Sequence, residues 1–282
     1  MKNLKTFLLM GVMTFLLMLI GSLIGGKQGV YFAFIFAAFT NFMSYWYSDK
    51  IVLSMYRARP VSENSDVYRI VKNLTERAGL PMPKVYTINE SQPNAFATGR
   101  NPKHAAVAVT TGLLNILDDN ELAGVIGHEL GHVKHRDILI GTVAATFAAA
   151  IAFLANMAKW AAIFGGNRDR DDEGGNPLAL IGVAIFAPIA AMLVQMCISR
   201  TREYKADEFG GQISGNPLYL ARALRKLEMG TERYHMDTNP AMENMFIVSP
   251  LSSGQKLASL FSTHPSTADR IAKLEAMAER GF

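Results

Sequence analysis

The residues best suited to chemistry in this chain form one short segment, His128-Glu129-Leu130-Gly131-His132. If the segment is helical, residues four apart lie one turn above each other, so both imidazoles can bind one metal ion. Glu129 is displaced around the helix but stays near the ion, where its carboxylate can act as a general base. The pattern therefore predicts a metal-dependent hydrolase with His128 and His132 as ligands and Glu129 as the base.

Two histidines are too few for a catalytic zinc ion, which usually has three protein ligands and one open position. The single cysteine, Cys197, excludes an internal disulfide and a zinc cluster built on cysteines. The extended metzincin pattern is also missing, because Ile138 stands where its third histidine would be. We therefore expect the third ligand to be a carboxylate from a distant part of the chain.

The segment Arg202-Glu203-Tyr204-Lys205-Ala206-Asp207 offers two suitable carboxylates. Glu203 and Asp207 are four residues apart, so a helix would place both on one face. Glu203 could bind the ion while Asp207 accepts the free ring N–H of a histidine ligand and fixes its tautomer. A solvated helix with a mixed-charge face would explain the same residues.

Four charge-free apolar runs have about the length that a membrane-spanning helix needs; they are residues 6–26, 28–48, 138–158 and 178–199. A cleaved signal peptide is the alternative for the first run, and buried core helices are the alternative for the last two. A hairpin of the last two runs would return Glu203 to the membrane face where His132 lies, which favours Glu203 as a ligand. The positions of Lys and Arg place both termini and the site in the cytoplasm.

The segments between these runs predict a helix over residues 62–78 that ends at Gly79, and short strands at 84–88, 95–98 and 105–110. A long helix should begin near Asp118, because Asp118 and Glu121 have the spacing of a capping box. Gly124, Gly127 and Gly131 form a stripe on that helix although glycine lowers helix propensity. We expect the helix that carries Glu203 to approach closely along this stripe.

These expectations describe a mainly α protein with a small β-sheet (α+β), in which a zincin-like metalloprotease domain is attached to four transmembrane helices. The predicted order is an N-terminal transmembrane hairpin (1–48), a first protease segment (49–137), a second hairpin with a short acidic loop (138–199) and a second protease segment (200–282). The net charge of +4, from 28 basic and 24 acidic residues, is too small to predict a nucleic-acid partner.

Together with Asn94-Ala95-Phe96-Ala97 and Ser262-Thr263-His264-Pro265, these motifs resemble the HtpX heat-shock protease family over nearly the whole chain. That family consists of membrane-bound zinc metallopeptidases similar in their core to the CAAX prenyl proteases and, more remotely, to gluzincins. The resemblance implies one Zn²⁺ ion with Glu203 as its third ligand. It also implies that His264 stabilises the transition state and that Arg270 is a polar partner near the site.

The expected function is an endopeptidase that cleaves misfolded or damaged membrane proteins at the cytoplasmic side of a bacterial inner membrane, as part of a stress response. Residues 94–97 would pair with an extended polypeptide substrate as an added strand, although an ordinary turn before a core strand explains them equally. The rival class is a non-catalytic membrane scaffold with a structural zinc site, followed by a transporter. A structural site would need a fourth protein ligand and no base such as Glu129.

Overall fold

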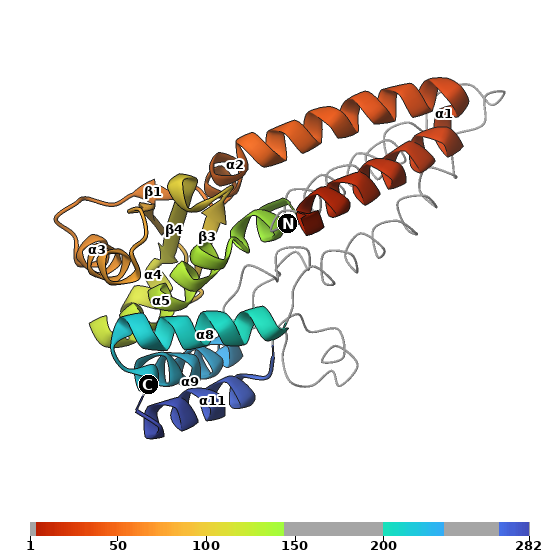
Figure 1. Cartoon of the computed structure of the whole chain (residues 1–282). Coiled ribbons are helices and arrows are strands. Elements are labelled where there is room, and N and C mark those ends of the chain that lie inside the picture. The colour runs from red at the N-terminus through yellow and green to blue at the C-terminus, as the bar shows by residue number, and fades with distance from the viewer. Residues whose placement is uncertain (1–3, 144–199, 234–264, 282) are drawn as a thin grey trace.

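The computed structural model describes residues 4–143, 200–233 and 265–281. These residues form a small β-sheet, a group of helices packed on one side of it, and a long helical hairpin that projects away from both (Figure 1). The sequence-based expectation of a mainly helical protein with a small sheet is confirmed. Most of the third apolar run, the whole fourth run and His264 lie outside the described residues.

The projecting hairpin is α1 (Leu4–Trp46), which is interrupted at Gly25 and Gly26. Gly26 has a φ of +54°, a conformation that favours glycine, and the two arms fold back on each other there (Figure 1). A Cβ atom built on Gly29 would overlap the carbonyl oxygen of Gly21. The arms therefore approach so closely near the turn that a side chain at either position would force them apart.

The two arms of α1 coincide with the first two predicted membrane spans, residues 6–26 and 28–48. Farther from the turn they are joined by a hydrogen bond of 2.8 Å from the Asn41 side chain to the Thr14 hydroxyl. Across the described part of the chain, no helix has both the length and the apolar character needed to cross a membrane. The structure thus gives these two runs as helices without showing that they span a bilayer.

The sheet has four strands in the order β1-β2-β4-β3. β2 and β4 are parallel, whereas the β1–β2 and β3–β4 pairs are antiparallel. β4 is buried along its whole length. Within the sheet formed by the described residues, β3 lies at one edge. Three strands have bounds close to those predicted from the sequence: β2 (Lys84–Ile88), β3 (Ala95–Gly99) and β4 (Ala105–Thr110). The two-residue strand β1 (Arg59–Pro60) was not predicted.

The helices begin and end where the local sequence supplies caps. α5 starts with the predicted capping box of Asp118 and Glu121, and α3 ends at Gly79 in the left-handed conformation. α3 begins four residues later than predicted, because the Ser65 side chain caps it by accepting from the Tyr68 N–H. The described helices are α2 (Ser48–Met55), α3 (Asp66–Ala78), the 3-10 helix η1 (Pro102–His104), α4 (Thr111–Ile116), α5 (Asp119–His135), α8 (Arg200–Ser214), α9 (Pro217–Arg233) and α11 (Thr267–Glu279).

α5 is the central helix and lies between the sheet and α8 (Figure 1). The predicted close approach of α8 is confirmed at two glycines: a Cβ on Gly127 would lie 3.0 Å from the Gly210 carbonyl oxygen, and one on Gly131 would lie 2.9 Å from the Ala206 Cα. The third glycine, Gly124, instead meets α9 at Leu220. The stripe thus lets two helices pack tightly against the helix that carries the histidines.

Candidate metal centre

Three potential ligands converge at the contact between α5 and α8. His128 and His132 extend from α5 with their Nε2 atoms 3.1 Å apart. Glu203, near the start of α8, places one carboxylate oxygen 3.7 Å from Nε2 of His128 and the other 3.5 Å from Nε2 of His132. The structure therefore brings together the three residues predicted from the sequence to be ligands, although α5 and α8 are far apart in the chain.

The spacing of these atoms fits a tetrahedral metal ion. Zinc binds histidine nitrogen and carboxylate oxygen at about 2.0–2.2 Å, so tetrahedral ligand atoms lie about 3.3 Å from each other. The two Nε2 atoms, 3.1 Å apart, are close to that spacing, and each ring nitrogen has a different Glu203 oxygen nearby, at 3.7 Å for His128 and 3.5 Å for His132. Two imidazoles and one carboxylate, without a thiolate, form the donor set of many catalytic zinc sites.

The outer nitrogen of His128 is held by a buried ion pair. Its Nδ1 lies 2.8 Å from Oδ1 of Asp207, and Arg270 donates to both oxygens of Asp207 at 2.7 and 2.8 Å. Burial raises the pKa of Asp207, but the charge and hydrogen bonds of Arg270 and the contact with His128 lower it more, to about 2. An ionised Asp207 favours the tautomer in which His128 Nδ1 carries the proton and Nε2 is free to bind metal.

Asp137 lies beside the second histidine in a similar way, and the sequence motifs did not predict this. Its carboxylate lies 3.7 Å from Nδ1 of His132 and 3.2 Å from the Arg202 guanidinium. The chain turns back after α5 because Arg136 adopts a left-handed conformation and the Asp137 N–H donates to the His132 carbonyl. The sequence shows only that a carboxylate follows the end of the predicted helix. Its position beside His132 depends on the cap geometry at Arg136, which the sequence does not reveal.

The two carboxylates beside His132 change its protonation. Burial lowers the pKa of His132, but Glu203 and Asp137 together raise it to about 9. Without metal, this imidazole therefore carries a proton at neutral pH. A metal ion must displace that proton in order to bind.

Glu129 is buried beside the ligands and faces the edge strand. Its Oε2 accepts a hydrogen bond of 2.8 Å from the backbone N–H of Ala97 in β3. Burial raises the pKa of Glu129, while the charges of His128 and His132 oppose this shift. The structure thus places a carboxylate with a raised pKa between the ligand histidines and an edge strand.

The predicted substrate segment lies at this edge, but its side chains have different surroundings. Asn94 is buried and exchanges hydrogen bonds with Thr110, while Ala95 belongs to the main core. Phe96 packs on the opposite side of the sheet against Tyr56, at a ring distance of 5.2 Å. Of the four residues, Ala97 is the one whose backbone contacts Glu129.

Comparison with known proteins identifies the family to which this site belongs. Residues 61–278 match peptidase family M48. The chain belongs to the M48 peptidase family. It is 57% identical over 278 residues to a protease HtpX homolog of Syntrophotalea carbinolica, covering 98% of this chain and 99% of the relative. It is also 54% identical over 279 residues to the protease HtpX of Legionella pneumophila, with coverage of 98% and 99%.

The fold of this M48 peptidase is similar to that of a solved structure, S. mikatae Ste24p, with a TM-score of 0.52. The match has 18% sequence identity and covers 94% of this chain and 62% of that chain. The family assignment confirms the predicted HtpX relationship and the predicted enzyme class, a metallopeptidase. His128, His132 and Glu203 are its candidate metal site.

Proposed function

We propose that this M48 peptidase is a zinc-dependent endopeptidase that hydrolyses polypeptides beside a membrane. The observation that carries the proposal is the convergence of His128, His132 and Glu203 next to Glu129, which contacts Ala97 of the edge strand and lies outside the set of ligand atoms. Three protein ligands leave a coordination position open for chemistry, as catalytic zinc sites do. Within the described residues, no fourth ligand completes the closed set that a structural zinc site would need.

Each side chain at the site has a role in peptide hydrolysis. A bound zinc ion supplies Lewis acidity, which polarises the scissile carbonyl and lowers the pKa of water. Glu129 takes the proton from the attacking water and then passes it to the leaving amine, which suits a carboxylate whose pKa is raised. Asp207, supported by Arg270, and Asp137 orient the two histidines. By family resemblance, His264 donates to the developing oxyanion.

An extended polypeptide binds along β3. An edge strand offers backbone donors and acceptors to an added strand, so recognition depends little on side-chain identity. The contact between Ala97 and Glu129 supports this site, because it puts the base directly beside that edge. Broad sequence tolerance agrees with a role in removing misfolded or damaged membrane proteins during stress.

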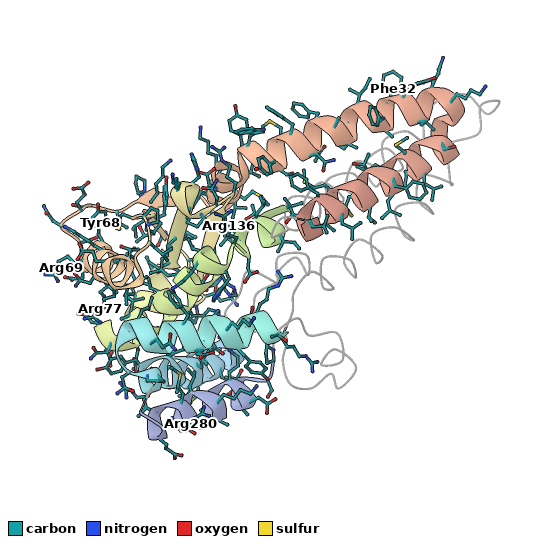
Figure 2. All side chains as sticks on the ribbon, viewed as in Figure 1. Phe32, Tyr68, Arg69, Arg77, Arg136 and Arg280 are labelled. Carbon is teal, nitrogen blue, oxygen red and sulfur yellow. The ribbon has the colours of Figure 1, made fainter. Side chains whose placement is uncertain are left out.

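The α1 hairpin attaches the peptidase to a bilayer. Large apolar side chains cover its outer surface, and Phe32 is 74% exposed and points away from the rest of the molecule (Figure 2). Soluble proteins rarely expose a continuous apolar patch of this kind, which supports burial in lipid. The proposed topology has four membrane helices, from residues 6–26, 28–48, 138–158 and 178–199, in a bacterial inner membrane. Both termini and the site face the cytoplasm.

The test compares the purified wild-type protein with a Glu129→Gln variant on casein, after both are loaded with zinc. We expect the variant to retain one zinc ion per chain and to lose peptidase activity by at least about a hundredfold, because it has no base. Equal activity of the two proteins would refute the mechanism. Zinc binding without cleavage by either protein would favour the alternative function, a non-catalytic membrane scaffold with a structural zinc site.

A further inference from the structure

A pocket lies away from the metal centre, where the end of α1 meets the start of α2 and the sheet. It has a volume of about 360 Å³, and its lining includes Trp46, Lys50, Lys84, Arg100 and His104. None of these residues has a role in the peptidase reaction derived above. The pocket therefore needs a separate explanation.

The sheet topology gathers the cationic side chains at one place. β2 and β4 are parallel, so Lys84 at the start of β2 and His104 just before β4 lie at the same end of the sheet. β3 runs antiparallel to β4, so Arg100, which follows β3, also reaches that end. Lys50 comes from α2, directly after α1. Three separate parts of the chain thus bring positive charge to the C-terminal end of α1, beside the sheet.

The aromatic side chains at the end of α1 hold two of these cations. The Arg100 guanidinium lies 4.6 Å from the centre of the Trp46 ring and donates to the Trp46 carbonyl at 3.4 Å. The Lys50 ammonium lies 5.4 Å from the centre of the Tyr47 ring. These contacts fix the positions of the cations without neutralising them.

The charge balance of the pocket favours an anion. One carboxylate, Asp49, lines the pocket together with the three basic residues. Among the residues that the structure describes, no carboxylate lies within ion-pair distance of Lys50, Lys84 or Arg100. Three unneutralised cations around one pocket are suited to a phosphate group.

We propose that this pocket binds the phosphate of an anionic membrane-lipid headgroup. The inference rests on the membrane attachment proposed above, since Trp and Tyr at the end of an apolar helix mark the boundary between lipid and water. Lipid phosphates lie at this boundary, so a pocket lined by Lys and Arg there can bind them directly. Free phosphate has the same chemistry but gains nothing from Trp46 and Phe42, which would contact the lipid beneath its headgroup.

The test uses Trp46 as the reporter, in a background with two substitutions. Trp160→Phe leaves Trp46 as the single tryptophan, and Glu129→Gln prevents proteolysis. The protein is reconstituted in phosphatidylcholine bilayers that contain increasing amounts of brominated phosphatidylglycerol, which quenches tryptophan on contact. We expect phosphatidylglycerol to bind beside Trp46 at least about fivefold more tightly than brominated phosphatidylcholine.

Two double variants remove the same amount of charge in different places. Lys84→Gln with Arg100→Gln should abolish the preference for phosphatidylglycerol. Lys72→Gln with Arg280→Gln should keep it, because both residues are exposed and outside the pocket, and Arg280 lies on α11's C-terminal side, far from α1 (Figure 2). Lys84→Arg with Arg100→Lys should also keep it. Loss of the preference in the charge-conserving or the remote variant would overturn the proposal, as would equal quenching by both lipids in the parent protein.

Two further measurements distinguish failure of the lipid site from failure of membrane attachment. Millimolar inorganic phosphate should leave the preference for phosphatidylglycerol unchanged. If phosphate abolishes that preference, the pocket is a site for a free anion. Flotation with pure phosphatidylcholine vesicles tests attachment alone. A protein that floats but shows no lipid preference would refute this pocket and leave the proposed function intact, whereas one that does not float would refute both membrane attachment and the lipid site.

Discussion

The backbone N–H of Ala97 donates a hydrogen bond to Oε2 of Glu129, at 2.8 Å. Ala97 is in the edge strand and Glu129 is in the central helix, so this bond joins the proposed substrate edge to the proposed base. A donor to a carboxylate stabilises its charged form and fixes its orientation. Substrate alignment and base position are therefore linked through one backbone group.

Replacement of Ala97 by proline should remove this bond, because proline has no N–H. We expect kcat to fall about tenfold or more, as for loss of a hydrogen bond to a charged group, while zinc content stays unchanged. The Glu129 pKa should rise without its donor, so the acidic limb of the pH–rate profile should move to higher pH. Ala97→Gly, which keeps the N–H, is the control, and an unchanged profile in the proline variant would contradict the assignment.

Replacement of Asp137 by asparagine tests the second histidine. We expect zinc affinity to fall about 10- to 100-fold, as when other partners of metal-binding histidines are removed. Competition with a zinc-binding dye measures this directly, without relying on turnover. Asp119→Asn is a suitable control, since this exposed carboxylate lies at the opposite end of α5. Equal zinc affinity in the Asp137 variant and the wild type would rule out the proposed orienting role.

Zinc binding should depend on pH because of His132. The metal-free imidazole has a pKa of about 9 and must lose its proton to become a ligand. Between pH 6 and 8 the affinity should therefore rise about tenfold for each pH unit, and this increase should level off above pH 9. Isothermal titration in buffers of different ionisation enthalpy would count the released protons. Binding at pH 7 without proton release would show that His132 is neutral before metal arrives.

The glycine stripe should be needed for helix packing. Gly127→Ala places a Cβ 3.0 Å from the Gly210 carbonyl oxygen, so we expect a loss of about 1–3 kcal/mol in the free energy of unfolding. Gly11→Ala is the matched control, because its Cβ would meet no atom within 4 Å and alanine favours a helix by about 0.5–1 kcal/mol. Chemical denaturation of both variants gives the comparison. Equal stability of the two variants would contradict close packing along the stripe.

Local sequence patterns predicted most of the elements that carry the site. The capping box at Asp118, the helical spacing after it and the glycine stripe are properties of neighbouring residues, so they could be read directly. The chemistry of the H-E-x-x-H segment and the order of the apolar runs then led to Glu203. In the structure, its carboxylate lies within 3.7 Å of both ring nitrogens.

Contacts between distant segments could not be predicted in the same way. The strand order β1-β2-β4-β3 depends on pairing between segments that have no shared local signal, and the two-residue strand β1 was missed. The approach of the Ala97 N–H to Glu129 depends on how the sheet sits on α5. Asp137 reaches His132 only because the chain turns back at Arg136. Each of these depends on tertiary packing rather than on residue type.

On the proposed ligand assignment, the division of His128, His132 and Glu203 between α5 and α8 also determines when the enzyme can become active. A ribosome completes His128 and His132 well before it adds Glu203, because residues 138–199 are made in between. A growing chain that ends before α8 therefore has two of the three proposed ligands and lacks the helix that packs on Gly127 and Gly131. The polypeptide cannot cut its neighbours, or itself, until synthesis has passed that helix.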